Sequence, residues 1–204
     1  KNKISKDWLI KQKKDNFFKQ SKIQGYRARS AFKLIEMDKK FKIISKETNF
    51  LDLGSSPGSW SQVAAKKITK GKILAIDINY MKPIDNVKFL QRDINESEIK
   101  YEITNYFGTK LEVVVSDMAA KTTGNKDLDS YRTGELCLKA MNIAFDSLNT
   151  NGIFLAKVFM GSIFTEINKK ANECFKKVVK YKPLSSRKES KEIYIYCKGI
   201  KKIW

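Results

Sequence analysis

The stretch Phe50–Gln62, FLDLGSSPGSWSQ, decides the fold of this chain. It begins with apolar residues interrupted by one carboxylate, Asp52, passes through a turn between Gly54 and Gly58, and ends in a helix-like segment, 60–67. A strand, a glycine turn and a helix start form the first unit of a doubly wound α/β fold. The two glycines allow a ligand to lie against the backbone, and the free N–H groups of the helix face that ligand.

The next apolar run, KILAID (72–77), ends in Asp77. A carboxylate at the end of the second strand is placed to hold ribose hydroxyls, in nicotinamide enzymes and in methyltransferases alike. The glycine spacing is G-x-x-x-G rather than the dinucleotide pattern G-x-G-x-x-G, and nothing resembles a hydride-transfer site. A nicotinamide oxidoreductase is therefore disfavoured, whereas a plain turn with a surface aspartate stays open on these residues alone.

Strand and helix patterns alternate along the rest of the chain, which predicts a mainly parallel sheet in one domain over 1–204. Within it we expect a basic helical extension over 1–45 and a catalytic core over 46–204. The predicted strands are 50–53, 72–77, 87–94, 111–119, 152–161 and 192–199. The predicted helices are 6–20, 25–41, 60–67, 130–152 (stopped by Asn151-Gly152) and 163–178.

The amino-acid composition indicates what kind of partner this chain binds. A formal net charge of +19 over 204 residues favours a polyanion, because each phosphate contact releases counterions. The alternative is compositional drift towards lysine on a solvated surface. The chain has no histidine, so the commonest general base and the commonest metal ligand are both missing. Cys137, Cys174 and Cys197 have neither metal nor disulfide spacing, so we expect no metal and a reducing compartment.

The sequence contains neither an apparent membrane span nor a secretory signal. No apolar run is long enough for a membrane span, and the lysine-rich start lacks a secretory pattern, so we expect an intracellular protein without membrane contact. The chain begins at Lys1 rather than Met, which leaves room for a lost targeting segment. An organelle such as the mitochondrion and the nucleus or cytoplasm stay open.

Charged side chains gather where the predicted strands end. Asp77, Asp93 and Asp117 follow strands, Glu192 opens the last strand, and Lys157 lies within an apolar one. Open α/β sheets bind ligands at the carboxyl ends of their strands, so the aspartates can line one pocket with the glycine turn. Lys157 must either extend to the surface or meet a carboxylate.

Six ordered blocks of the chain resemble the FtsJ family of S-adenosylmethionine-dependent RNA ribose 2′-O-methyltransferases. They are GYRARSAFKL (25–34), LDLGSSPGSWSQ (51–62), FLQRDI (89–94), VVSDMA (114–119), FLAKVFMG (154–161) and PLSSRKESKEIYIYCKG (183–199). The resemblance covers the chain from about Ser5 to Gly199. It implies a Rossmann-like class I methyltransferase fold, with a mostly parallel seven-stranded sheet, helices on both faces and S-adenosylmethionine as cofactor.

The resemblance also assigns roles. Lys157 is implied to activate the ribose 2′-hydroxyl, with Asp117 orienting it, while Lys33 and Glu192 position the substrate. Methyl transfer from a sulfonium to an oxygen needs mainly positioning and removal of one proton, which a lysine near carboxylates can perform. The residues implied to contact the cofactor are Gly54, Ser56, Pro57, Gly58, Trp60, Asp77, Asp93, Ile94 and Asp117. The chain departs from the family pattern at Ser59 and at Ala120-Lys121, on the rim of this pocket.

For the substrate, the resemblance favours a uridine in large-subunit ribosomal RNA, free or in the assembled subunit, and a monomeric enzyme. The alternatives are a tRNA anticodon-loop methyltransferase with the same chemistry and a catalytically silent RNA-binding protein, which the intact catalytic set argues against. The basic leading helices are expected to hold the RNA backbone. The residues predicted to do so are Lys11, Lys13, Lys14, Arg27 and Arg29.

Overall fold

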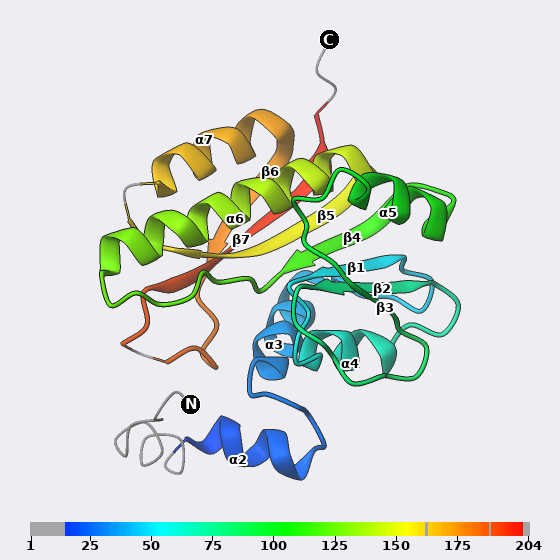
Figure 1. Ribbon diagram of the computed structural model, residues 1–204, viewed down its shortest axis with the longest axis horizontal. Coiled ribbons are helices and arrows are strands. Elements are labelled where there is room, and N and C mark those ends of the chain that lie inside the picture. Colours follow the sequence, from blue (N-terminus) through cyan, green and yellow to red (C-terminus); the bar gives the residue numbers. More distant parts are fainter. Residues whose placement is uncertain (1–14, 162, 188, 202–204) are drawn as a thin grey trace.

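The computed structural model describes residues 15–161, 163–187 and 189–201, and its centre is a seven-stranded sheet (Figure 1). The strand order is β3-β2-β1-β4-β5-β7-β6. Strands β1 to β5 run parallel, and β7 lies antiparallel between β5 and β6. The strands are β1 Phe50–Leu53, β2 Ile73–Asp77, β3 Lys88–Gln91, β4 Leu111–Ser116, β5 Leu148–Phe159, β6 Phe175–Tyr181 and β7 Glu192–Ile200. The predicted Rossmann-like architecture is confirmed.

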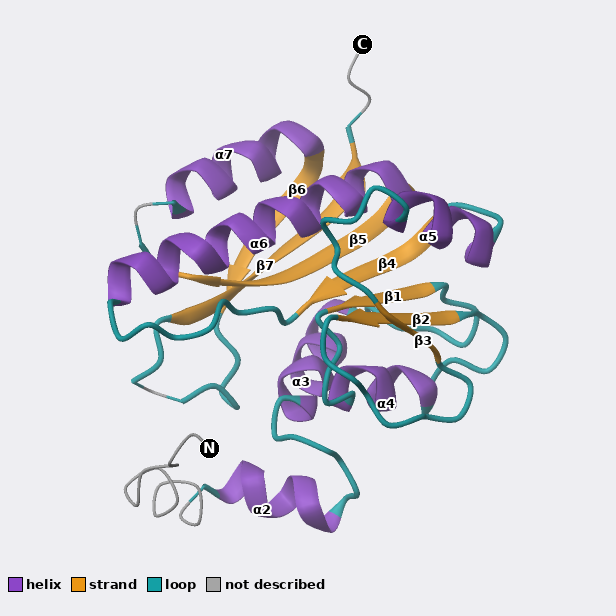
Figure 2. Cartoon of the chain, in the orientation of Figure 1, coloured by secondary structure: helices purple, strands orange, loops and turns teal. Residues whose placement is uncertain are grey.

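Helices cover both faces of the sheet (Figure 2). The helices are α2 Asn16–Ile23, α3 Ala31–Phe41, α4 Ser59–Ala65, α5 Ile99–Phe107, α6 Lys126–Ser147 and α7 Phe164–Cys174. One core cluster joins the sheet to α5, α6 and α7, and a second joins its other face to α3 and α4. Successive residues of a strand therefore enter opposite cores, as Tyr194 and Ile195 of β7 do.

The glycine turn after β1 brings the backbone close to the chain that follows β4. All four residues of β1 are buried, and Gly54 follows with φ +75°. A Cβ at this position would lie 2.1 Å from Cγ of Met118, so only glycine fits beneath that side chain. The turn therefore leads from the strand into α4 while keeping the end of β4 close beside it.

Two helix boundaries differ from the prediction. Helix α3 begins at Ala31, because the chain from Gly25 to Ser30 forms turns that carry Arg27 and Arg29 ahead of the helix. Helix α6 begins at Lys126, where the Asn125 side chain accepts the first N–H groups, and it ends at Ser147.

The predicted helix stop at Asn151-Gly152 is wrong, since both residues lie in β5. Pairing between Leu148 and Leu111 of β4 ends the helix earlier, and the register shifts immediately afterwards. The glycine is needed there because a Cβ would lie 2.8 Å from the Leu148 side chain.

The seventh strand, β6, occupies residues that we predicted as the end of a helix over 163–178. The helix stops at Cys174, and Phe175–Tyr181 pair with β7. The sequence FKKVVKY places Phe175, Val178 and Val179 at helical spacing, so it is compatible with the period of a helix as well as with that of a strand. Its exposed lysines suit an edge strand, where charge discourages pairing with another chain.

Helix α3 is part of the core. Its residues Leu34 and Met37 are fully buried, so the expected division at residue 45 cuts through packed structure, and a separate basic extension is not confirmed. The first half of the helix predicted over 6–20 lies outside the described residues, and α2 forms the second half and continues to Ile23. Across 15–161, 163–187 and 189–201, none of the helices has the length and apolar character of a membrane span.

Candidate active site

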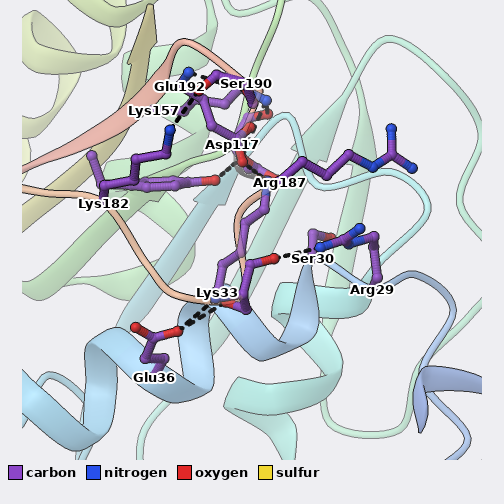
Figure 3. A network of polar contacts seen from close by, with 12 residues as sticks. Arg29, Ser30, Lys33, Glu36, Asp117, Lys157, Lys182, Arg187, Ser190 and Glu192 are labelled. Atoms are coloured by element: carbon purple, nitrogen blue, oxygen red, sulfur yellow. Dashed lines mark hydrogen bonds and ion pairs between the residues drawn. The ribbon is translucent and has the colours of Figure 1, made fainter. Parts of the chain in front are cut away.

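Two ion pairs meet at the carboxyl ends of the central strands (Figure 3). In the first, Lys157 of β5 places Nζ 3.2 Å from Oδ1 of Asp117, and the same nitrogen donates to the Asp117 carbonyl at 2.6 Å. In the second, Nζ of Lys33 on α3 lies 2.6 Å from Oε1 of Glu192. The structure therefore brings the four predicted catalytic residues together from the end of β4, which Asp117 directly follows, and from β5, α3 and β7.

Tyr194 connects the two pairs, and sequence reasoning did not assign it to the site. Its hydroxyl donates to Oδ1 of Asp117 at 2.7 Å, and the Lys33 ammonium lies 5.8 Å from its ring centroid. The signal was its position two residues after Glu192, because alternate residues of a strand share a face. Burial, followed by the charges of Asp117 and Glu192, raises the pKa of Tyr194 well above its ordinary value, so the hydroxyl stays a donor.

Asp117 is held ionised. Burial by itself raises the pKa of this carboxyl, but the charges of Lys157 and Lys33 and the hydrogen bond from Tyr194 outweigh it and lower the pKa below the ordinary value. The side chain retains 19% exposure, so the carboxylate faces a space that a ligand can enter.

Two adjoining cavities open beside this carboxylate and share Gly54, Ser56 and Asp117. The larger measures about 300 Å³ and the smaller about 110 Å³. Of the residues predicted to contact the cofactor, the larger is lined by Gly54, Ser56, Asp77, Asp93, Ile94 and Asp117. The smaller is lined by Gly54, Ser56, Pro57, Trp60 and Asp117, together with Ser30, Asp52, Ser55 and Ser59.

Gly58 is the one predicted cofactor residue that lines neither cavity. A Cβ there would lie 2.8 Å from the side chains of Arg27, Met81 and Ile84. The Arg27 guanidinium passes this point and donates to the carbonyls of Pro57, Lys82 and Pro83 at 2.7–3.0 Å. Gly58 therefore makes room for an arginine that ties together two loops behind the cavities.

The carboxylates of the larger cavity organise their own loops. Asp77 accepts hydrogen bonds from the N–H groups of Ser56 at 2.9 Å and Asn79 at 2.7 Å, which joins the glycine turn to the end of β2. Asp93 lies two residues beyond β3 and accepts from the N–H of Asn95 at 2.9 Å. Three acidic side chains in one cavity favour a ligand that carries positive charge and hydroxyl groups.

The smaller cavity contains polar atoms without partners. Within the described chain, Oδ1 of Asp52 and Oγ of Ser55 are buried and make no hydrogen bond, whereas Oδ2 of Asp52 accepts from Ser61 at 2.7 Å. Burial, opposed by the bond from Ser61 and reinforced by the charges of Asp117 and Asp77, raises the pKa of Asp52 to about 7. These free atoms fit a ligand whose end near the glycine turn is polar.

Ser59, one of the departures from the family pattern, is buried in the lining of the smaller cavity and shares a hydrogen bond of 2.7 Å with Ser30. Trp60 donates from Nε1 to the Ser30 carbonyl at 2.9 Å, which links α4 to the turn before α3. The second departure, Ala120-Lys121, directly follows Ala119, which lines the larger cavity, and the Ala120 N–H donates to Thr133 of α6.

Helix α3 also holds the loop between β6 and β7. Glu36, one turn after Lys33, accepts hydrogen bonds from Tyr181 Oη at 2.6 Å and Leu184 N at 2.7 Å, and from both N and Oγ of Ser185 at 3.0–3.1 Å. Burial alone raises the pKa of Glu36, but these bonds together lower it, so the carboxylate stays ionised. The loop that leads to Glu192 is thereby fixed to the helix that carries Lys33.

The predicted RNA contacts are only partly described. Lys11, Lys13 and Lys14 lie outside the described residues. Arg27 is engaged with backbone carbonyls, as above. Arg29 pairs with Asp15 and donates to the Ser185 carbonyl, so it lies between α2 and the loop before β7. Among the described residues no group of three acidic or cysteine side chains is arranged to hold a metal.

The fold and site resemble known methyltransferases. The sequence model of the FtsJ-like methyltransferase family matches residues 26–200. The "Ribosomal RNA large subunit methyltransferase E" of Pelagibacter ubique is 48% identical over 198 residues, which cover 97% of this chain and 98% of that protein. The protein of the same name from Chromobacterium violaceum is 42% identical and covers 98% of both chains.

A crystal structure of a ribosomal RNA methyltransferase from Plasmodium falciparum superposes with a TM-score of 0.77 at 33% identity, covering 86% of this chain and 98% of that one. Fold and site therefore define a Rossmann-like methyltransferase. The chain belongs to the FtsJ-like methyltransferase family, which confirms the resemblance read from its six sequence blocks. S-adenosylmethionine is its cofactor, and the acidic, partly unpaired lining of the two cavities fits that molecule.

Proposed function

We propose that this enzyme methylates the 2′-hydroxyl of a ribose, at a uridine, in large-subunit ribosomal RNA. The observation that carries the reaction type is the contact between Lys157 and Asp117 beside the two cavities. The names of the relatives from P. ubique and C. violaceum support the choice of RNA. Their identity extends over nearly the whole chain, so it includes the segments that surround the site.

The chemistry requires positioning and one proton acceptor. When bound, S-adenosylmethionine supplies an electrophilic methyl group. We assign acceptance of the 2′-hydroxyl proton to the neutral amine form of Lys157 Nζ, while Asp117 orients that nitrogen. Lys33, whose ammonium lies over the Tyr194 ring, and its partner Glu192 are assigned to the ribose and its neighbours. For the cofactor, we assign Asp77 to ribose hydroxyls, Asp93 and Ile94 to the adenine side of the larger cavity, and Gly54, Ser56, Pro57 and Trp60 to the methionine end.

The deciding experiment is transfer of labelled methyl to undermethylated large ribosomal subunits, with free ribosomal RNA and bulk tRNA alongside. We expect label in a ribose of the large-subunit RNA, recovered as a 2′-O-methylated uridine. Label in tRNA alone would replace this proposal with the anticodon-loop activity. Cofactor binding without transfer to any of these RNAs would favour the silent RNA-binding protein.

We predict that Asp77→Ala weakens S-adenosylmethionine binding by roughly 10- to 100-fold, the scale of losing one or two hydrogen bonds to a charged group. The substitution removes the proposed ribose acceptor and also releases the Ser56 N–H from the glycine turn. Calorimetric titration with the cofactor measures the change. Asp146→Ala is the matched control, since this exposed carboxylate pairs with Lys100. Equal cofactor affinity in both variants would remove Asp77 from the proposed site.

A further inference from the structure

Asp15, Arg29 and Arg187 form a cluster beside the active site that neither ion pair includes. Both guanidiniums approach the same oxygen, Oδ2 of Asp15: Arg29 through a close ion pair and Arg187 at 3.7 Å. The Asp15 side chain is 10% exposed and that of Arg187 is 39% exposed. One carboxylate is thus enclosed by two cations, of which the second still faces solvent.

The two arginines are carried by the segments that carry Lys33 and Glu192. Arg29 lies in the turn before α3, four residues ahead of Lys33, and Arg187 lies in the loop before β7, five residues ahead of Glu192. The Arg29 guanidinium also donates to the Ser185 carbonyl, which binds it to this loop. Figure 3 shows Arg29 and Arg187 on the same side of the polar network. Their placement is therefore fixed relative to the proposed reaction centre.

Two guanidiniums this close repel each other. Burial first, and then the charge of Arg187, lower the pKa of Arg29. An anionic oxygen between them relieves this repulsion, and paired arginines around an oxyanion are the preferred geometry for phosphate as well as for carboxylate. In the structure that oxygen belongs to Asp15, the residue that caps the N-terminus of α2 by accepting from Phe18 N at 3.2 Å.

We propose that Arg29 and Arg187 form a binding site for a backbone phosphate of the substrate RNA, and that the Asp15 carboxylate fills this site until the phosphate displaces it. The inference rests on the proposed function, because it takes RNA as the substrate. RNA must break the contacts of Asp15 before it can bind, which lowers its apparent affinity. A purely structural carboxylate would have the opposite effect, since its loss would loosen α2 and weaken binding.

The test is the affinity for a fluorescently labelled fragment of large-subunit ribosomal RNA, measured by anisotropy at fixed salt. Asp15→Asn removes the competing charge while asparagine caps a helix as well as aspartate does. We expect this variant to bind the RNA roughly 3- to 10-fold more tightly, as expected for the loss of one competing ion pair. The matched control is Asp146→Asn, which makes the same charge change at the end of α6, in a pair with Lys100.

Arg187→Gln provides an independent measurement. Losing one phosphate contact should weaken binding and reduce the slope of log K against log salt by about one. When Arg187→Gln is combined with Asp15→Asn, the gain in RNA affinity from Asp15→Asn should vanish, because the two side chains act on one site. Thermal unfolding of each variant checks that α2 and the loop stay folded.

Asp15→Asn binding no tighter than Asp146→Asn, or Arg187→Gln with an unaltered salt slope, would overturn the phosphate site. These binding measurements do not depend on methyl transfer. Absence of transfer to ribosomal RNA, together with tighter binding by Asp15→Asn, would reject the proposed function and retain the site. Normal methyl transfer to ribosomal RNA without tighter binding by Asp15→Asn would retain the proposed function and reject the phosphate site.

Discussion

Lys157→Met is expected to reduce single-turnover methyl transfer by about 10²- to 10⁴-fold, the range that a positioned proton acceptor contributes. Methionine has nearly the length of lysine and suits the apolar part of β5, 153–159, but it cannot take a proton. The cofactor should still bind almost normally, because Lys157 lines neither cavity. Rates with saturating RNA, and the cofactor dissociation constant measured separately, distinguish these two effects.

Lys157→Arg separates the loss of the proton acceptor from the loss of the positive charge. Arginine keeps a positive charge next to Asp117, yet it stays protonated at any working pH. If Lys157 accepts the ribose proton, the arginine variant should be almost as inactive as the methionine variant. Activity near wild type in Lys157→Arg would show that only the charge matters. Lys198→Met, an exposed lysine of β7, is the control for loss of a strand lysine.

Asp52→Asn is expected to remove a pH dependence of stability. The pKa of Asp52 is raised to about 7 in the folded protein, mainly by burial, whereas the ordinary value is 3.8. The folded state therefore binds this proton more tightly than the unfolded state does. Its contribution to stability is fully present below pH 3.8 and is lost as the pH rises towards 7.

Between pH 5 and pH 8 the wild type should lose about 2–3 kcal/mol of unfolding free energy relative to Asp52→Asn. Urea unfolding of the cofactor-free enzyme at several pH values measures the difference. Asp146→Asn should follow the wild-type curve, because its carboxylate is exposed. Parallel curves for the wild type and Asp52→Asn would mean that the Asp52 carboxyl ionises normally despite its burial.

The parts of the fold that the sequence predicts are those with one strong local signal. Strand β4 is a nearly continuous apolar run, and the glycine turn between Gly54 and Gly58 needs conformations that other residues rarely adopt. Residues 175–181 lack such a signal, because the lysine and valine pairs of FKKVVKY also satisfy helical spacing. What makes them a strand is pairing with β7, which lies later in the chain.

The same distinction applies to the site. Asp117 and Lys157 stand out as charges beside or within apolar strands, so the sequence alone marks them. Glu36, Asp15 and Arg187 look like ordinary surface charges until folding places their partners, which are more than ten residues away for all three. The resemblance implies a cofactor contact for Gly58, whereas the structure uses its missing side chain to admit Arg27.

The position of β7 also determines when the enzyme can become active during its synthesis. This strand lies between β5 and β6 but leaves the ribosome after both of them. Until it emerges, β6 has no neighbour with which to pair, and Lys33 lacks Glu192. The glycine turn and the acidic loops that line the larger cavity are complete much earlier. The segments that line the larger cavity therefore leave the ribosome before Glu192 does, and the proposed catalytic set is complete only once β7 has inserted between β5 and β6.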